Sequence, residues 1–272
     1  DIVAGNLKFT PAANANGTDY DSFKFTVNDG TADSSTSSTM TIDVTAVNDL
    51  PTAADKTVTA TEDTAFDFAL ADFGFSDVET GQLQSITVTT LSSTGTLALN
   101  GSAVTSGQVI SQSNISAGLL TFTPLTNANG TDYDSFKFTV NDGTADSSTS
   151  STMTIDVTAV NDSPVAVTDS YTTLQNTQLT ASVESNGLLL NDTDADLDVL
   201  AVNTTPVSNV TNGTLTLATD GSFTYSPNST FFGNDSFTYQ VTDGNGGTDT
   251  ASVTISVTLS PGVFQPLSIG GY

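Results

Sequence analysis

The stretch that decides the fold runs from Asn127 to Asp162 and reads NANGTDYDSFKFTVNDGTADSSTSSTMTIDVTAVND. The same letters occur from Asn14 to Asp49, at an offset of 113 residues (127 − 14), which is the size of one small domain. An identical segment repeated at domain spacing indicates a tandem array. The chain is therefore expected to consist of repeated domains.

Apolar and polar side chains alternate along two segments of this stretch. A period of two places one set of side chains in a core and the other in water, which predicts two half-buried antiparallel strands. The apolar positions are Phe136, Phe138, Val140, Met153, Ile155 and Val157.

Working outward, residues 50–162 are predicted to form one complete domain. Short strand patterns are separated by turn pairs such as Asn100-Gly101 and Asp142-Gly143, and no helical period is present. About seven short strands at this spacing are typical of an immunoglobulin-like (Ig-like) β-sandwich, so the fold class is all-β. The expected strands are Lys56–Ala60, Ala65–Leu70, Leu83–Leu91, Gly95–Leu99, Gly118–Thr123, Ser135–Val140 and Ser151–Val160.

The remaining chain reads as parts of the same array. Residues 1–49 match the C-terminal part of the domain, so their apolar side chains lack an opposing sheet: Phe9, Phe23, Phe25 and Met40. Either the chain is a segment of a longer array, or another chain supplies the missing strands by β-augmentation. Residues 163–260 read as a diverged third repeat, in which Gly213-Thr-Leu matches Gly95-Thr-Leu. Residues 261–272 share no pattern with the repeats and are interpreted as a tail, a connector or a strand available for pairing elsewhere.

The charge of the chain restricts its partners. Thirty acidic residues oppose four basic ones, giving a formal net charge of −26, so a nucleic-acid-binding surface is excluded. Divalent cations are the natural counterions. The chain has no cysteine. No apolar run approaches the roughly 18 residues that span a bilayer, so membrane insertion is not expected.

Several motifs together carry a family resemblance. They are a VND-x-P boundary, an EDT turn, FSDVE, GTL, LTFTP, NANG-x-x-Y, SFKFTVNDG and a closing TMTIDVTAVND. This set resembles the bacterial cadherin-like/VCBS-type tandem repeats over about 95% of the chain, most specifically in the first two repeats. The resemblance implies a linear array of Ig-like or cadherin-like antiparallel β-sandwiches. It also implies an extracellular or cell-surface location, as the extender of a large secreted adhesin.

Acidic residues gather at the loops that such an array brings to its domain junctions, because the loops of a sandwich cluster at its two poles. At one pole of the second repeat the expected group is Asn48, Asp49, Asp72, Asp77, Glu79, Asp142 and Asp146. The opposite pole, with the third repeat, is expected to gather Glu62, Asp63, Asp132, Asp134, Asn161, Asp162, Asp192, Asp194, Asp196, Asp198, Asp243 and Asp249.

Carboxylates crowded in this way repel one another unless they hold a cation, and oxygen-only ligand sets suit Ca²⁺ better than Mg²⁺. The alternative interpretation is that these acids only form turns and solubilise the surface, which we favour for Asp19, Asp220 and Asp235. Asp192-x-Asp194-x-Asp196 resembles the start of an EF-hand, but Leu197 and Asn203 replace its glycine and glutamate. The third repeat carries Gln175-Asn176 where the second has Glu62-Asp63, so the cation-binding series is expected to stop there.

No enzyme is predicted, because the chain has no histidine, no cysteine nucleophile and no phosphate-binding loop. The favoured function is a calcium-stiffened extender whose partners are the neighbouring repeats of its own chain. The alternative is a subunit of a self-assembling extracellular homopolymer, in which another copy donates strands to residues 1–49. A ligand-binding module is the weakest hypothesis, since no exposed aromatic cluster offers a binding platform.

Overall fold

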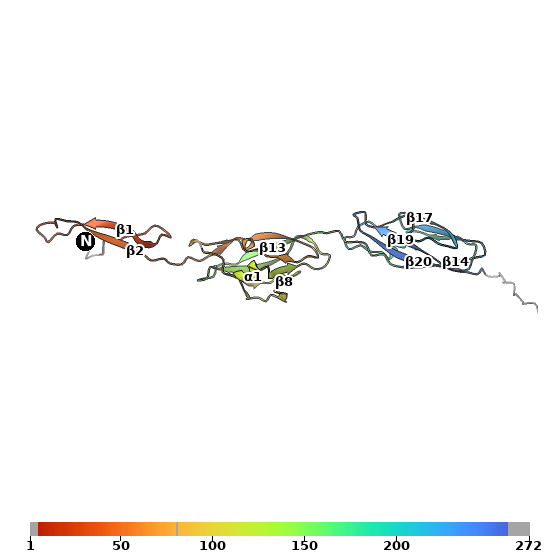
Figure 1. Ribbon diagram of the computed structural model, residues 1–272, viewed down its shortest axis with the longest axis horizontal. Helices are drawn as coiled ribbons and strands as arrows, with labels where there is room; N and C mark the ends of the chain where they lie inside the picture. The colour runs from red at the N-terminus through yellow and green to blue at the C-terminus, as the bar shows by residue number, and fades with distance from the viewer. Residues whose placement is uncertain (1–4, 80, 261–272) are drawn as a thin grey trace, which may run out of the picture. The chain divides into compact units, whose positions relative to one another are not determined.

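The computed structural model describes residues 5–79 and 81–260 (Figure 1). Two compact units divide the chain, Asp1–Thr158 and Ala159–Tyr272, which are called unit 1 and unit 2 and are described separately. The interpretation of residues 261–272 as a tail or strand lies outside the described residues. Within the described part of the chain, no helix is long and apolar enough to cross a membrane.

Unit 1 begins with a hairpin of two strands, β1 (Gly17–Phe25) and β2 (Ser38–Val44). They pair antiparallel, with Phe23 opposite Met40, and form a two-stranded sheet of their own. Phe9, Phe23 and Met40 are exposed, so the prediction that this face lacks an opposing sheet is confirmed for these side chains.

The rest of unit 1 is a sandwich of two sheets. One sheet has the order β10-β7-β12-β13-β4 and the other the order β5-β11-β8-β9, so the predicted all-β sandwich is confirmed. The first and last strands of the sandwich, β4 and β13, pair in parallel. The strands of the larger sheet are β4 (Lys56–Thr61), β7 (Ser85–Thr90), β10 (Val109–Ser111), β12 (Gly130–Asn141) and β13 (Ser151–Thr158). Those of the smaller sheet are β5 (Phe66–Asp67), β8 (Thr96–Leu99), β9 (Ser102–Ala103) and β11 (Leu120–Thr123), and β3 (Thr52–Ala53) pairs separately with β6 (Phe75–Ser76).

The expectation of no helix is wrong at two places in unit 1. The predicted strand over Ala65–Leu70 is interrupted, because a 3₁₀ turn, η1 (Leu70–Phe73), follows the short β5. The Ala69 N–H donates to Asp72 Oδ2 at 2.8 Å, a local bond that favours the turn. Likewise, Ser111 Oγ accepts from the Asn114 N–H and caps the five-residue helix α1 (Gln112–Ser116). The Asp72 bond overrides the end of the predicted strand, whereas α1 lies between two expected strands.

Phenylalanine dominates the core of unit 1. Phe136 packs edge-to-face on Phe68, with ring centroids 5.5 Å apart, and Phe138 packs in the same way on Phe73 at 5.1 Å. All four side chains are buried. A Cβ at Gly95 would collide with the ring of Phe122, so the start of β8 needs a glycine there.

Unit 2 repeats this plan with its own core. The larger sheet has the order β14-β20-β19-β16 and the smaller one the order β15-β18-β17, and β14 pairs in parallel with β20 as β4 does with β13. Gly213 again leaves room for an aromatic ring, here that of Tyr225, as the Gly-Thr-Leu correspondence predicts. A 3₁₀ turn, η2 (Leu188–Leu190), is a third departure from the expected absence of helix. The strands are β14 (Asp169–Leu174), β15 (Leu179–Ala181), β16 (Ala201–Val202), β17 (Gly213–Leu217), β18 (Phe223–Pro227), β19 (Gly233–Thr242) and β20 (Thr248–Thr258).

Candidate metal centre

In unit 1 the dipeptide Asn48-Asp49 is bonded to two acidic loops of the sandwich. Asn48 Nδ2 donates to Asp142 Oδ2 at 3.0 Å and to the Asp49 carbonyl at 2.6 Å. The Asp49 N–H donates to Glu79 Oε1 at 2.8 Å. The amide side chain of Asn48 and the backbone of Asp49 therefore hold two carboxylates, Asp142 and Glu79, close to the chain that precedes β3.

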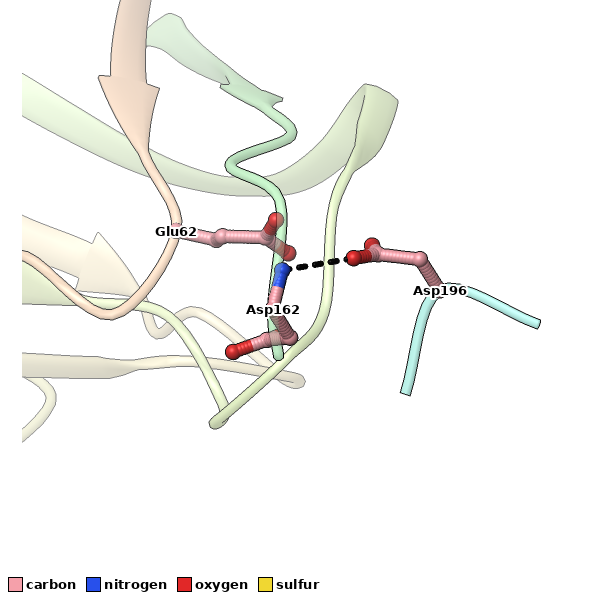
Figure 2. A group of neighbouring side chains, drawn as sticks. All are labelled: Glu62, Asp162 and Asp196. Carbon is pink, nitrogen blue, oxygen red and sulfur yellow. Dashed lines mark hydrogen bonds between the residues drawn. The ribbon is translucent and has the colours of Figure 1, made fainter. Parts of the chain in front are cut away.

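Unit 2 builds the same arrangement around Asn161-Asp162. Asn161 Nδ2 donates to Asp243 Oδ2 at 2.8 Å and to the Asp162 carbonyl at 3.0 Å. The Asp162 N–H donates to Asp196 Oδ2 at 2.7 Å, as the dashed line in Figure 2 shows. Glu62, also drawn in Figure 2, belongs to unit 1 and is described with that unit below. We call the two arrangements the Asn-Asp clamps. They share every hydrogen bond, although Glu79 in unit 1 is replaced by Asp196 in unit 2.

A second acid stands two residues before Glu79 in one clamp and before Asp196 in the other. Asp77 Oδ1 accepts from the Glu79 N–H at 2.8 Å, and Asp194 Oδ1 accepts from the Asp196 N–H at 2.9 Å. The other oxygen, Oδ2, of both Asp77 and Asp194 is buried and has no hydrogen-bond partner among the described residues. A buried carboxylate oxygen without a donor is unfavourable, and a bound cation would satisfy it.

The loop that ends each clamp is also built to hold a carboxylate. Asp142 Oδ1 accepts from the amides of Thr144 and Ala145. Asp243 Oδ1 accepts from three amides of the turn Gly244-Asn-Gly-Gly247. The side chain of Asn161, and after it the turn amides, hold the pKa of Asp243 below its usual value despite partial desolvation. The amides of Ala145 and then the side chain of Asn48 likewise lower the pKa of Asp142. Both carboxyl groups are therefore ionised at neutral pH, as ligands for a hard cation must be.

Three acids of unit 2 meet at one point. One carboxylate oxygen from each of Asp194, Asp198 and Asp243 lies within 4.8 Å of the other two. Asp198 is positioned by Asn245, whose Nδ2 donates to Asp198 Oδ2 at 2.7 Å. Three carboxylates at this separation repel one another, and a divalent cation would remove the repulsion. Their oxygen-only chemistry, together with the unpartnered oxygen of Asp194, fits Ca²⁺.

Several acids that the sequence nominates as ligands have structural partners instead. Asp134 is buried, and its two oxygens accept from the amides of Ser93, Thr94, Gly95 and Ser135. This bonding assigns Asp134 to the Ser93–Gly95 loop rather than to a metal. Three more carboxylates accept hydrogen bonds within unit 1: Asp72 from the Ala69 amide, Asp146 from the Asn141 side chain, and Asp63 from the Asn127 amide. Asp132 is held by its backbone, whose amide donates to Asp156.

Two nominated acids of unit 2 also bond within their own sandwich. Asp192 accepts from the Val167 amide at 2.7 Å and from the Tyr239 hydroxyl at 3.0 Å, and it is buried. Asp249 accepts from the Ala166 amide at 2.9 Å. Asp169, which sequence reasoning missed, adds a further partly buried carboxyl group, and burial followed by the charge of Asp192 raises its pKa to about 6. The only signal for Asp169 is a lone acid before a strand pattern, which is too common to single out.

Glu62 closes a turn at the end of β4. Its N–H donates to the Thr158 carbonyl at 3.0 Å and its Oε2 accepts from Asn129 Nδ2 at 3.0 Å. Gln175 occupies the same place in unit 2, where its N–H donates to the Thr258 carbonyl at 2.8 Å. Asp63 and Asn176 follow with left-handed φ values of 56° and 60°. The two turns therefore have the same backbone conformation, but only the turn of unit 1 carries acidic side chains. The predicted approach of Glu62-Asp63 to Asn161-Asp162 stays a prediction.

Both units match known domain families. Residues 2–45 and 48–158 match the bacterial Ig domain, and residues 161–259 match the bacterial cadherin-like domain. Neither description is that of an enzyme. Integrin beta-like protein E of Dictyostelium discoideum is 40% identical over 93 residues, which are 34% of this chain and 5% of that protein. The chain thus spans a small part of the length of this relative.

Solved structures of cadherin repeats are similar at low identity. Domains EC1-2 of human mucin-like protocadherin are 17% identical, with 77% of this chain and 98% of that chain covered at a TM-score of 0.45. Extracellular cadherin domains 1–4 of protocadherin gamma B7 are 14% identical, with 83% and 55% covered at a TM-score of 0.44. At these scores the likeness carries no information about function.

Proposed function

Because the chain belongs to the bacterial Ig domain family and its second unit matches the bacterial cadherin-like domain, we propose that it is a structural extender of an extracellular surface protein. In this role its tandem sandwiches form a calcium-stiffened rod that projects an adhesive domain. The neighbouring repeats of the same chain are its partners.

The repetition of the Asn-Asp clamp carries the proposal. Two clamps with the same hydrogen bonds stand at the entrance to two successive sandwiches, and each is next to a buried carboxylate oxygen that lacks a donor. Acids that only formed turns on the surface would instead have their unbonded carboxylate oxygens exposed to water. The residues that would hold Ca²⁺ are Asp77, Glu79 and Asp142 with Asn48-Asp49, and Asp194, Asp196, Asp198 and Asp243 with Asn161-Asp162. The ion supplies positive charge that relieves repulsion and fixes the entering chain to the loops.

Calcium titration of the full chain tests this proposal. Sites of the weak, extracellular type bind with Kd values of about 10⁻⁴–10⁻³ M, which corresponds to about 1.5–2.7 kcal/mol of added stability at roughly 10 mM calcium. We expect heat of binding in calorimetry and a higher Tm in calcium than in chelator. Absence of binding together with equal Tm values would refute the proposal.

The variant Asp194→Asn sharpens the test, because its effect should change sign. Without calcium the amide removes repulsion from Asp198 and Asp243, so unit 2 should be as stable as the wild type or more so. With calcium the variant should lose most of the added stability. Asp220→Asn is the matched control, because it changes the net charge equally. In the described part of the chain, the side chain of Asp220 bonds only to Ser222, within its own turn. Equal responses of the two variants to calcium would contradict the site.

A second candidate function is a subunit of a self-assembling extracellular filament. The exposed apolar face of β1–β2 favours it, since a neighbouring copy could cover that face. Sedimentation of the full chain over a range of concentrations separates the two functions. Monomers at all concentrations favour the extender, and growing assemblies favour the filament.

A further inference from the structure

The strands β8 of unit 1 and β17 of unit 2 occupy matching places in the two smaller sheets, but their outer edges differ. In unit 1, β9 covers the outer edge of β8, with Ala98 opposite Ala103. The carbonyl of Leu97 there accepts from the Val104 amide at 2.9 Å. In unit 2 the chain turns back from β17 directly into β18, and the smaller sheet has the order β15-β18-β17. No strand of the described chain therefore pairs with the outer edge of β17.

Hydrogen bonds at the two ends of β17 show which of its backbone groups face this open edge. At one end the Asn228 amide donates to the Asn212 carbonyl at 2.8 Å, and at the other the Ala218 amide donates to the Ser222 carbonyl at 2.9 Å. Because bonding alternates along an antiparallel pair, every second residue counted from Asn212 bonds to β18. The residues between them turn their N–H and C=O groups to the open edge, and these are Gly213, Leu215 and Leu217.

β17 also lacks the features that protect the other sheet edges of the chain. Short strands and charged side chains are the usual protection against pairing with another chain. Every other edge strand among the described residues is either two or three residues long, as β9, β15 and β16 are, or charged, as β4 is at Lys56 and β14 at Asp169. β17 has five residues, no charge and no proline, and its Thr214 and Thr216 are exposed.

We propose that β17 pairs antiparallel with β17 of a second copy of this chain, about a two-fold axis at Leu215. In this register Leu215 lies opposite Leu215 of the second copy, and Thr214 lies opposite Thr216 of the second copy. Every outward N–H and C=O group of the strand then meets a partner group. The two smaller sheets join into one, with leucine beside leucine on the core side and threonine beside threonine on the outer side.

The chemistry of the strand favours a second copy over a different partner. A foreign strand would satisfy the backbone groups, but β17 itself also matches the alternation of leucine and threonine on the two faces. A basic segment would find no carboxylate on Gly213–Leu217 to bind. Pairing about a two-fold axis uses the same edge on both copies, so it closes as a dimer.

The dimer is expected to be weak, and its two chains run in opposite directions. The contact is smaller than the roughly 1,200 Å² of a stable interface, so we expect a Kd of about 10⁻⁴–10⁻³ M. Each chain carries a net charge of −26, so salt should tighten the dimer by screening the repulsion. Chains that project from two facing surfaces run in opposite directions, and the dimer would join them. That consequence rests on the proposed extender role, whereas the pairing does not.

Charged variants of the full chain test the pairing. Thr214→Lys with Thr216→Lys places like charges opposite each other across the axis, and Thr214→Asp with Thr216→Asp does the same with negative charges. In sedimentation velocity each variant should be monomeric at concentrations where the wild type dimerises, and an equal mixture of the two should dimerise again. Gln178→Lys with Thr180→Lys is the matched control, because it adds the same charge at the β15 edge of the same sheet. This control should dimerise as the wild type does.

Cysteine cross-linking tests the register, since the chain has no cysteine of its own. A mixture of Thr214→Cys and Thr216→Cys chains should form a disulfide between copies, because the two positions face each other at a Cα separation of about 4.5–5.5 Å. Either variant alone should cross-link far less.

Three results would overturn the proposal. The first is a wild type that stays monomeric up to about 10⁻³ M in high salt. The second is a pair of charged variants that each dimerise as well as the wild type, and the third is a mixture of them that stays monomeric. All measurements are made in chelator, so their failure would leave the proposed calcium-binding function untouched, and loss of calcium binding would leave the pairing untouched.

Discussion

The two hairpins β1–β2 and β12–β13 have the same sequence in two different environments. Their short-range polar bonds agree closely: the Asp19 amide donates to Asp43 at 2.8 Å, and the Asp132 amide donates to Asp156 at 2.8 Å. The turn bonds agree as well, with Asn28 Nδ2 to Asp33 Oδ1 at 2.7 Å and Asn141 Nδ2 to Asp146 Oδ1 at 2.8 Å. Local structure in this segment is therefore encoded within the segment.

The long-range bonds do not agree. Asp134 accepts from three amides of the Ser93–Gly95 loop, whereas among the described residues its counterpart Asp21 accepts only from the neighbouring Ser22 amide. The burial of β12–β13, the contacts of its rings with Phe68 and Phe73, and these bonds all come from the rest of the sandwich. The contribution of a side chain to the stability of this fold therefore depends on what covers it. Because the two hairpins have the same sequence, the same substitution can be made in each and its effects on stability compared.

The largest expected difference is between Phe136→Ala and Phe23→Ala. Removal of the buried ring of Phe136 leaves a cavity and should lower the unfolding free energy of unit 1 by about 3–5 kcal/mol. Removal of the exposed ring of Phe23 should change it by less than about 0.5 kcal/mol. Denaturant unfolding, followed through unit 1, measures both. Equal losses would mean that the first hairpin is covered in solution.

Asp134→Ala against Asp21→Ala should give the next largest difference. The substitution at Asp134 leaves partly buried amides of the Ser93–Gly95 loop without an acceptor, at about 1–3 kcal/mol, while the one at Asp21 should be nearly neutral. Burial raises the pKa of Asp134, but the amides of Ser93, Gly95, Thr94 and Ser135 outweigh it and hold that pKa below 3.8. Its stabilisation is thus present above the unfolded pKa and lost as pH falls through the folded one. Acid titration of the wild type and of Asp134→Asn, which lacks that titration, should show the difference below about pH 4.

The third version of the hairpin, β19–β20, carries Tyr239 where β12 carries Phe138. The acids beside Tyr239 give the stability of unit 2 a pH dependence opposite in sign to that from Asp134. The Tyr239 hydroxyl donates to Asp192, and Asp169 lies beside this pair. Burial and then the charge of Asp192 raise the pKa of Asp169 to about 6. The folded state then binds more protons than the unfolded state between the two pKa values, so the contribution of Asp169 weakens as pH rises from about 4 to 6. Asp169→Asn should raise the Tm of unit 2 at pH 7 and not at pH 4. The gain should stay under about 1 kcal/mol, since the site is partly exposed to solvent.

Tyr20 and Tyr133 should give a smaller difference than the phenylalanine and aspartate pairs of the two hairpins. The Tyr20 hydroxyl accepts from the Ala12 amide at 3.3 Å, and the Tyr133 hydroxyl accepts from the Leu125 amide at 3.0 Å. Tyr→Phe at Tyr133 should cost unit 1 about 0.5–1.5 kcal/mol. The same change at Tyr20 should raise amide exchange at Ala12 without altering the stability of the sandwich. Unchanged exchange at Ala12 would show that the bond is absent in solution.

Much of the fold follows from the sequence because period-two alternation is a local property. The strands around Phe136, Phe138 and Met153 were predictable for that reason, as was the exposure of Phe23. The turns η1 and α1 were not, because their caps Asp72 and Ser111 are ordinary polar residues in sequence.

The candidate site was predictable in part. The sequence indicates which loops carry acids, and so it nominates Asp77, Asp142, Asp194 and Asp243 together with Asp72, Asp134 and Asp192. It does not say which oxygens already have donors. That depends on amides from distant loops, such as Ser93 for Asp134 and Val167 for Asp192, which only the tertiary structure brings near.

The parallel pairing of the first and last strands has a mechanical consequence. When a sandwich is pulled by its two ends, β4 is drawn from its start and β13 from its finish, so the six residue pairs between Lys56–Thr61 and Met153–Thr158 are loaded in shear and must break together. Unit 2 has the same arrangement, with six pairs between β14 and β20. Antiparallel terminal strands would instead peel apart one bond at a time. A tether exposed to flowing liquid would resist extension at both sandwiches for this reason.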